Sequence, residues 1–119
     1  MMKLIKSFTY ALAGIKSCFK SESNFRIHII AAVAALIFSL LLSMSALEWI
    51  AICFCIAFVI VMEMINTAIE KLCDVAHLEQ HPVIKKVKDI AAGAVLVSAV
   101  FSLITACIIF LPKIITYFK

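Results

Sequence analysis

Three long runs of apolar residues leave this sequence few ways to fold. They lie within residues 27–44, 47–72 and 84–111, and a helix of about 20 apolar residues crosses the hydrocarbon core of a bilayer. Hydrophobic residues make up 66% of the 119 residues and charged residues 15%, so a soluble domain of this length could not bury its apolar surface. The sequence therefore predicts an all-α membrane protein, a single domain over residues 1–119, with membrane-spanning helices in these three ranges.

The segments outside these three runs predict the rest of the architecture. Residues 3–20 place apolar side chains on one helical face and lysines on the other, which is typical of an amphipathic helix in the membrane interface. A soluble cap is the alternative. We expect a tight turn at residues 43–46, a polar loop at residues 77–82, and an end of the third helix at Pro112.

Basic residues gather before the first run and after the second. This asymmetry follows the positive-inside rule and predicts that residues 1–26 and the polar loop are cytoplasmic. Lys113 and Lys119 are exceptions to the pattern. The net charge is +4, but we expect no nucleic-acid partner, since no basic surface domain remains to bind one. The five cysteines form no CxxC pair and are interpreted as small apolar residues.

A row of polar residues at the end of the second run is the most informative feature. Glu63, Asn66, Glu70 and Asp74 fall within an arc of about 80° on one helix. Solvation alone explains a charged helix end, but it would not keep the acids on one side. Ionisable groups at the edge of a membrane are costly and usually functional.

Acids without matching bases suggest a divalent cation. Carboxylate and amide oxygens suit Mg²⁺, commonly together with substrate phosphates. Lys88 and Asp89 open the third helix close to where the second ends, so a phosphate could lie between these two helices. Glu22 stands at the same membrane level and could add a third carboxylate. The only glycines are Gly14 and Gly93, which excludes a P-loop or a kinase glycine loop.

Three blocks of sequence resemble one known family. The block Glu63-Met64-Ile65-Asn66-Thr67-Ala68-Ile69-Glu70 with Asp74, the block from Lys88 to Leu96, and the block from Glu22 to His28 resemble the bacterial diacylglycerol kinase and undecaprenol kinase family. The resemblance implies a homotrimer that transfers the γ-phosphate of MgATP to a lipid alcohol at the cytoplasmic interface.

The resemblance also implies roles for individual residues. Glu63 is implied as the general base, Asn66 as a residue that orients the site, and Glu22 and Glu70 as the metal ligands, which also contact ATP. Glu63 and Ala92 are implied to contact the lipid substrate. The remaining residues implied in ATP binding are Lys3, Tyr10, Asp74, Glu79, His81, Lys88 and Asp89.

The lipid and the class of function leave alternatives open. Asn24 and His28 resemble the undecaprenol kinases, which favours undecaprenol over diacylglycerol, although His28 is also explained as a helix-end residue without a catalytic task. A small non-enzymatic membrane subunit, or a cation-binding component of a channel, is the alternative of another class. An ion path would place acids through the bilayer centre, whereas here they gather at one edge.

Overall fold

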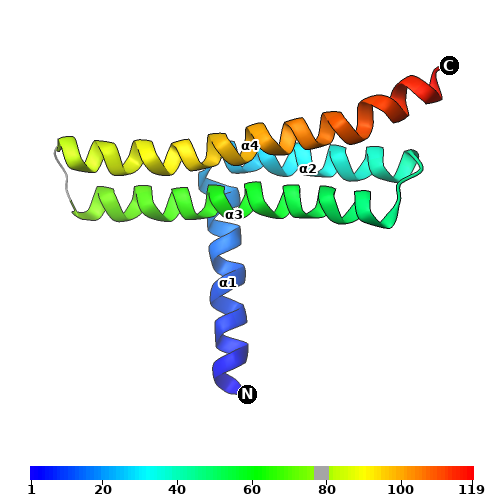
Figure 1. Cartoon of the computed structure of the whole chain (residues 1–119). Coiled ribbons are helices and arrows are strands. Elements are labelled where there is room, and N and C mark those ends of the chain that lie inside the picture. The colour runs from blue at the N-terminus through cyan, green and yellow to red at the C-terminus, as the bar shows by residue number, and fades with distance from the viewer. Residues whose placement is uncertain (77–80) are drawn as a thin grey trace.

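Four helices form the computed structural model, which describes residues 1–76 and 81–119. They are α1 (Met2–Ser21), α2 (Ser23–Leu41), α3 (Ala46–Ala76) and α4 (Pro82–Tyr117). Helices α2, α3 and α4 lie side by side, and α1 runs away from them crosswise (Figure 1). The last three helices are long and apolar enough to cross a membrane, as the sequence predicts.

Local signals explain where the helices begin. Ser45 and Glu48 form a capping box at the start of α3, since the Glu48 amide donates to Ser45 Oγ at 3.2 Å and the Ser45 amide donates to Glu48 Oε1 at 2.9 Å. His81 caps α4 by accepting a hydrogen bond from the Val83 amide, and Pro82 occupies the first turn, where no amide proton is needed.

A single extended residue separates α1 from α2. Glu22 has φ −115° and ψ 111°, which breaks the helix. The Arg26 guanidinium donates to the carbonyls of Phe19 and Lys20 at 2.7 and 3.0 Å. These carbonyls belong to the last turn of α1, where no following turn supplies backbone amides for them to accept. Arg26 therefore holds the end of α1 against the start of α2.

The helices bury a small core, in which small and polar residues accompany a few large apolar ones such as Phe25 and Ile52. Ala91 and Ser98 of α4 are buried, and Ser102 Oγ of α4 donates to the Cys55 carbonyl of α3. Small residues let membrane helices approach closely. Most of the large apolar side chains are exposed in the single chain, which is expected of surfaces that face lipid or other subunits.

Several helix boundaries differ from the sequence prediction. The first span is α2, which begins at Ser23 and ends at Leu41 instead of covering residues 27–44. Pro112 does not end the third helix, because α4 continues through it to Tyr117. A proline removes one backbone hydrogen bond but leaves the neighbouring ones, and membrane helices tolerate this loss. Thr116 Oγ1 donates to the Pro112 carbonyl at 2.8 Å and supports the turn that follows.

The helix lengths place Glu63 at one edge of the membrane-spanning layer. Helix α2 is about 28 Å long, and Glu63 lies about 26 Å along α3 from the turn that joins the two helices. Glu63 is therefore level with the start of α2. Helix α3 continues for about 20 Å beyond that level, and α4 runs beside it.

Candidate active site

Glu63 is the central side chain of the candidate site. Its side chain is only 4% exposed, and Oε2 lies 3.8 Å from His28 Nε2 of α2. It also interacts electrostatically with Glu70 and with Glu22 of the α1–α2 junction. The structure thus gathers Glu22 and Glu70 around Glu63, with His28 beside Glu63, which the row on α3 alone did not require.

Asn66 and Glu70 continue the row toward the end of α3. Asn66 Nδ2 donates to Glu70 Oε1 at 3.4 Å, so the amide restrains the carboxylate. Asn66 is 7% exposed, and its Oδ1 atom has no hydrogen-bond partner among the described residues. A buried acceptor without a partner is costly, and a bound water or ion can supply the missing contact.

The outer part of the row pairs with α4. Lys88 Nζ lies 2.6 Å from Asp74 Oδ1 and also interacts with Glu70. Lys85 pairs with Asp89 at 2.7 Å on the exposed side of α4. Lys88, which the sequence predicts to neutralise phosphate charge, therefore lies close to the acid row.

Several predicted residues are not brought to this cluster within one chain. Lys3 and Tyr10 are exposed on the part of α1 that points away from the bundle, and Tyr10 is 71% exposed. Ala92 is exposed on α4, next to the buried Ala91. Glu79 lies outside the described residues, and His81 serves as the cap of α4.

The donor set fits a magnesium ion that substrate phosphates help to hold. Among residues 1–76 and 81–119, no group of three or more His, Cys, Asp or Glu side chains is arranged to hold a metal unaided. Mg²⁺ commonly binds through one or two carboxylates, with phosphates and waters supplying the rest. Glu22 and Glu70 both neighbour Glu63, and the unpartnered Asn66 Oδ1 adds a neutral oxygen.

An apolar groove ends at His28, the residue that lies 3.8 Å from Glu63. It has a volume of about 240 Å³ and runs between α2 and α4 across one face of α3, with His28 at its end. Small side chains line both walls, among them Ala31, Ala32 and Ala35 of α2 and Ala99 and Ala106 of α4. A space that suits a hydrocarbon chain therefore reaches the pair of His28 and Glu63.

Sequence reasoning missed two residues at the site. Arg26 fixes the α1–α2 junction that carries Glu22, and Cys18 is 8% exposed beside Glu22, Lys71 and Glu63. Neither contact has a signal in the local pattern, because both arise from the way that α1 meets the bundle.

The Cys18 thiol gives a testable pH dependence. Burial, and then the nearby Glu22 carboxylate, raise the pKa of Cys18 above its ordinary value of 9.0. Because only the thiolate reacts, we expect iodoacetamide to modify Cys18 more slowly than added glutathione at pH 8, at a rate that still increases above pH 9. Peptide mapping by mass spectrometry measures both rates. Equal rates at pH 8 would contradict the burial of this thiol.

Comparison with known proteins identifies the family. The chain is a three-span membrane protein with a carboxylate cluster at one edge of the spans. The sequence profile of the prokaryotic diacylglycerol kinase family matches residues 9–110. The chain therefore belongs to this family, and it is a lipid kinase. The family excludes the non-enzymatic alternative.

Individual relatives carry two different names. An undecaprenol kinase of Bacillus subtilis is 43% identical over 112 residues, covering 94% of this chain and 91% of that protein. A diacylglycerol kinase of Synechocystis is 34% identical over 114 residues, covering 95% of this chain and 65% of that longer protein. A diacylglycerol kinase of Escherichia coli K12 is 27% identical over 107 residues, covering 90% and 88%.

Proposed function

We propose that this chain phosphorylates undecaprenol with ATP at the cytoplasmic face of the bacterial inner membrane, as a homotrimer. The observation that carries the proposal is the buried Glu63 carboxylate beside His28, which lines one end of an apolar groove, in a family of lipid kinases. The similarity to an undecaprenol kinase over nearly the whole chain supports this lipid over diacylglycerol.

The residues at the site account for the chemistry of the transfer. Glu63 accepts the proton of the lipid hydroxyl, the hydroxyl oxygen bonds to the γ-phosphorus, and the bond from that phosphorus to the β–γ bridging oxygen breaks, which releases ADP. His28, 3.8 Å from Glu63, orients the carboxylate toward the groove. Asn66 holds Glu70 in position.

Charge neutralisation completes the proposed site. Glu22 and Glu70 would hold Mg²⁺, which lowers the repulsion between the triphosphate and these carboxylates. Lys88 adds a positive charge near Glu70, and nucleotide binding would draw it from Asp74 toward the phosphates. Lys3, Tyr10, Glu79, His81 and Asp89 are proposed to contact the nucleotide.

The helix lengths and the charge pattern support the proposed location of the site. Glu63 is level with the start of α2, where α1 leaves the bundle crosswise, as an amphipathic helix at a membrane surface does. In this arrangement the lipid hydroxyl and the soluble nucleotide meet at one depth. The exposed apolar surfaces of a single chain support its assembly into a trimer.

A competition assay tests the choice of lipid. We expect undecaprenol to be phosphorylated in preference to diacylglycerol at equal mole fraction in mixed micelles, because the groove accepts one chain between small side chains and offers few donors for ester oxygens. The measurement is the ratio of the two labelled products. A higher kcat/KM for diacylglycerol would refute the undecaprenol assignment and leave the reaction type intact.

A further inference from the structure

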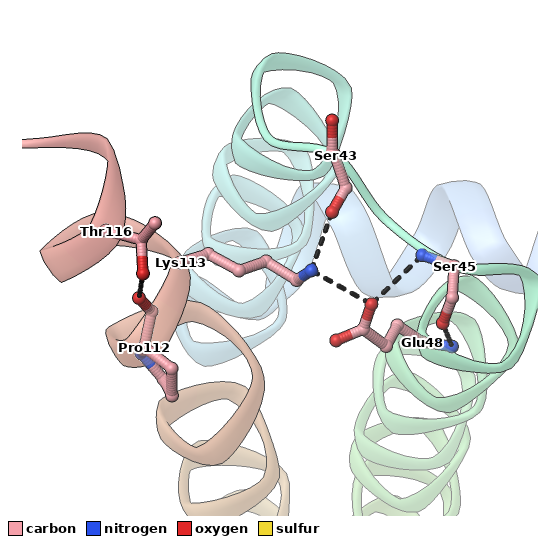
Figure 2. A network of polar contacts seen from close by, with 6 residues as sticks. All are labelled: Ser43, Ser45, Glu48, Pro112, Lys113 and Thr116. Carbon is pink, nitrogen blue, oxygen red and sulfur yellow. Dashed lines mark hydrogen bonds and ion pairs between the residues drawn. The ribbon is translucent and has the colours of Figure 1, made fainter.

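A polar cluster joins all three spanning helices at the end of the bundle far from Glu63. Lys113 of α4 lies 3.0 Å from Glu48 Oε1 of α3, and its Nζ donates to the Ser43 carbonyl after α2 at 2.6 Å (Figure 2). Neither side chain is freely exposed, since Lys113 is 24% exposed and Glu48 is 29% exposed. We call Lys113, Glu48 and Ser43 the outer clamp.

The capping box at the start of α3 holds the Glu48 side chain in place independently of Lys113. The same Glu48 oxygen that contacts Lys113 also accepts the Ser45 amide in the capping box of α3. Lys113 follows Pro112, and the end of α4 diverges from α2 and α3 beyond this region (Figure 1). The lysine side chain therefore ties α4 to the bundle where the helix begins to leave it.

This tie bears on the groove, because α2 and α4 form its two walls. At the outer end of these walls, Phe38 of α2 and Phe110 of α4 contact each other with ring centroids 6.4 Å apart. Lys113 lies one helical turn beyond Phe110 and bonds to the turn that follows α2. Elsewhere α4 is anchored to α3, by Lys88 with Asp74 and by Ser102 with Cys55, and neither contact sets the distance between the walls.

We propose that the outer clamp sets the width of the groove and thereby selects which lipid alcohol the enzyme accepts. This inference rests on the function proposed above. A lipid tail already lies in an apolar solvent, so entering the groove gains little hydrophobic energy. Selection must come from shape, and shape depends on how closely α2 and α4 are held. The occupant is the single branched chain of a polyprenol, since the groove ends at His28, which lies 3.8 Å from the candidate base Glu63.

The test compares Lys113→Met with Glu48→Gln and the double variant. Each single change removes the ion pair, while methionine keeps most of the side-chain length and glutamine keeps an oxygen for the Ser45 amide. We expect the ratio of kcat/KM for undecaprenol to that for diacylglycerol to fall about tenfold in Lys113→Met, the size of a modest steric discrimination. Glu48→Gln should lower the ratio less, because the bond from Lys113 to the Ser43 carbonyl remains. The double variant should fall no further than Lys113→Met, because Lys113 takes part in both contacts. The KM for ATP should not change.

Two further readouts separate the outer clamp from the rest of the protein. Lys119→Met removes a lysine at the same end that makes no ion pair with the described residues, and it should keep the parent ratio. Trp49 adjoins Glu48 and is the only tryptophan, so its quenching by an aqueous quencher should rise when the clamp opens.

Three outcomes distinguish the claims. An unchanged lipid ratio in folded Lys113→Met, or a larger loss in Glu48→Gln than in Lys113→Met, would overturn the role of the clamp. If the parent prefers diacylglycerol, the lipid assignment fails, and a changed ratio in the variants still supports the clamp. A parent that phosphorylates neither lipid would overturn the proposed function, and this inference with it.

Discussion

Replacing Glu63 by glutamine should nearly abolish lipid phosphorylation and leave the protein folded. Glutamine has the same shape but cannot accept the proton of the lipid hydroxyl, and general-base catalysis contributes about 10²- to 10⁴-fold in rate. The side chain is 4% exposed, so the change also removes a buried charge instead of creating one. The protein should therefore insert and assemble as the parent does.

The measurement is kcat with saturating MgATP and undecaprenol in mixed micelles. The loss should appear in kcat, while the KM for ATP and the Mg²⁺ titration stay close to those of the parent. Glu63→Asp is the matched variant, because it keeps a carboxylate at a shorter reach and should retain partial activity. Similar rates for the parent and Glu63→Gln would remove Glu63 from the role of base.

Replacing Glu70 by alanine should weaken the use of Mg²⁺ and ATP together. Glu70 is half-buried, held by Asn66 at 3.4 Å and near Lys88, so it is suited to bind a cation that also contacts phosphates. We expect the Mg²⁺ midpoint and the KM for ATP to rise together, on the order of 10- to 100-fold, as for changes in the shells of other metal sites.

The design of this experiment separates Glu70 from Glu63. Glu70→Gln keeps the acceptor for Asn66 Nδ2 and removes only the charge, so an equal effect in the two Glu70 variants assigns the loss to the carboxylate. Glu63→Gln provides the opposite pattern, with kcat reduced and the Mg²⁺ titration unchanged. An unaltered Mg²⁺ titration in Glu70→Ala would show that the metal binds elsewhere.

The spanning helices and the acid row could be predicted from sequence because both are local. Apolar runs of sufficient length define α2, α3 and α4, and a spacing of three or four residues places Glu63, Asn66, Glu70 and Asp74 on one side of α3. The position of Glu63 at the end of an apolar run also indicated a site at the edge of the membrane.

Contacts between helices could not be predicted in the same way. The pair of His28 with Glu63 depends on how α2 packs against α3, and Lys113 meets Ser43 across 70 positions of sequence. Lys113 appeared to be an exception to the positive-inside pattern, but Glu48 neutralises it in the structure. Pro112 was expected to end a helix, but α4 continues through it, because a proline removes only one backbone hydrogen bond and Thr116 Oγ1 donates to the Pro112 carbonyl.

The nucleotide-binding residues remain a prediction for a further physical reason. Lys3 and Tyr10 lie on the part of α1 that points away from the cluster of their own chain. Their implied role as ATP ligands depends on how chains assemble, which one chain does not define. The trimer and the nucleotide contacts therefore stay part of the proposed function.

The most direct test of lipid kinase activity with ATP follows the γ-phosphate itself. Purified protein in mixed micelles is given Mg²⁺, ATP labelled at the γ-phosphate, and undecaprenol, diacylglycerol or a simple long-chain alcohol. We predict that the label moves to the lipid, most rapidly to undecaprenol, with one ADP formed for each lipid phosphate. Release of the label only as inorganic phosphate, or no transfer to any alcohol, would contradict lipid kinase activity with ATP.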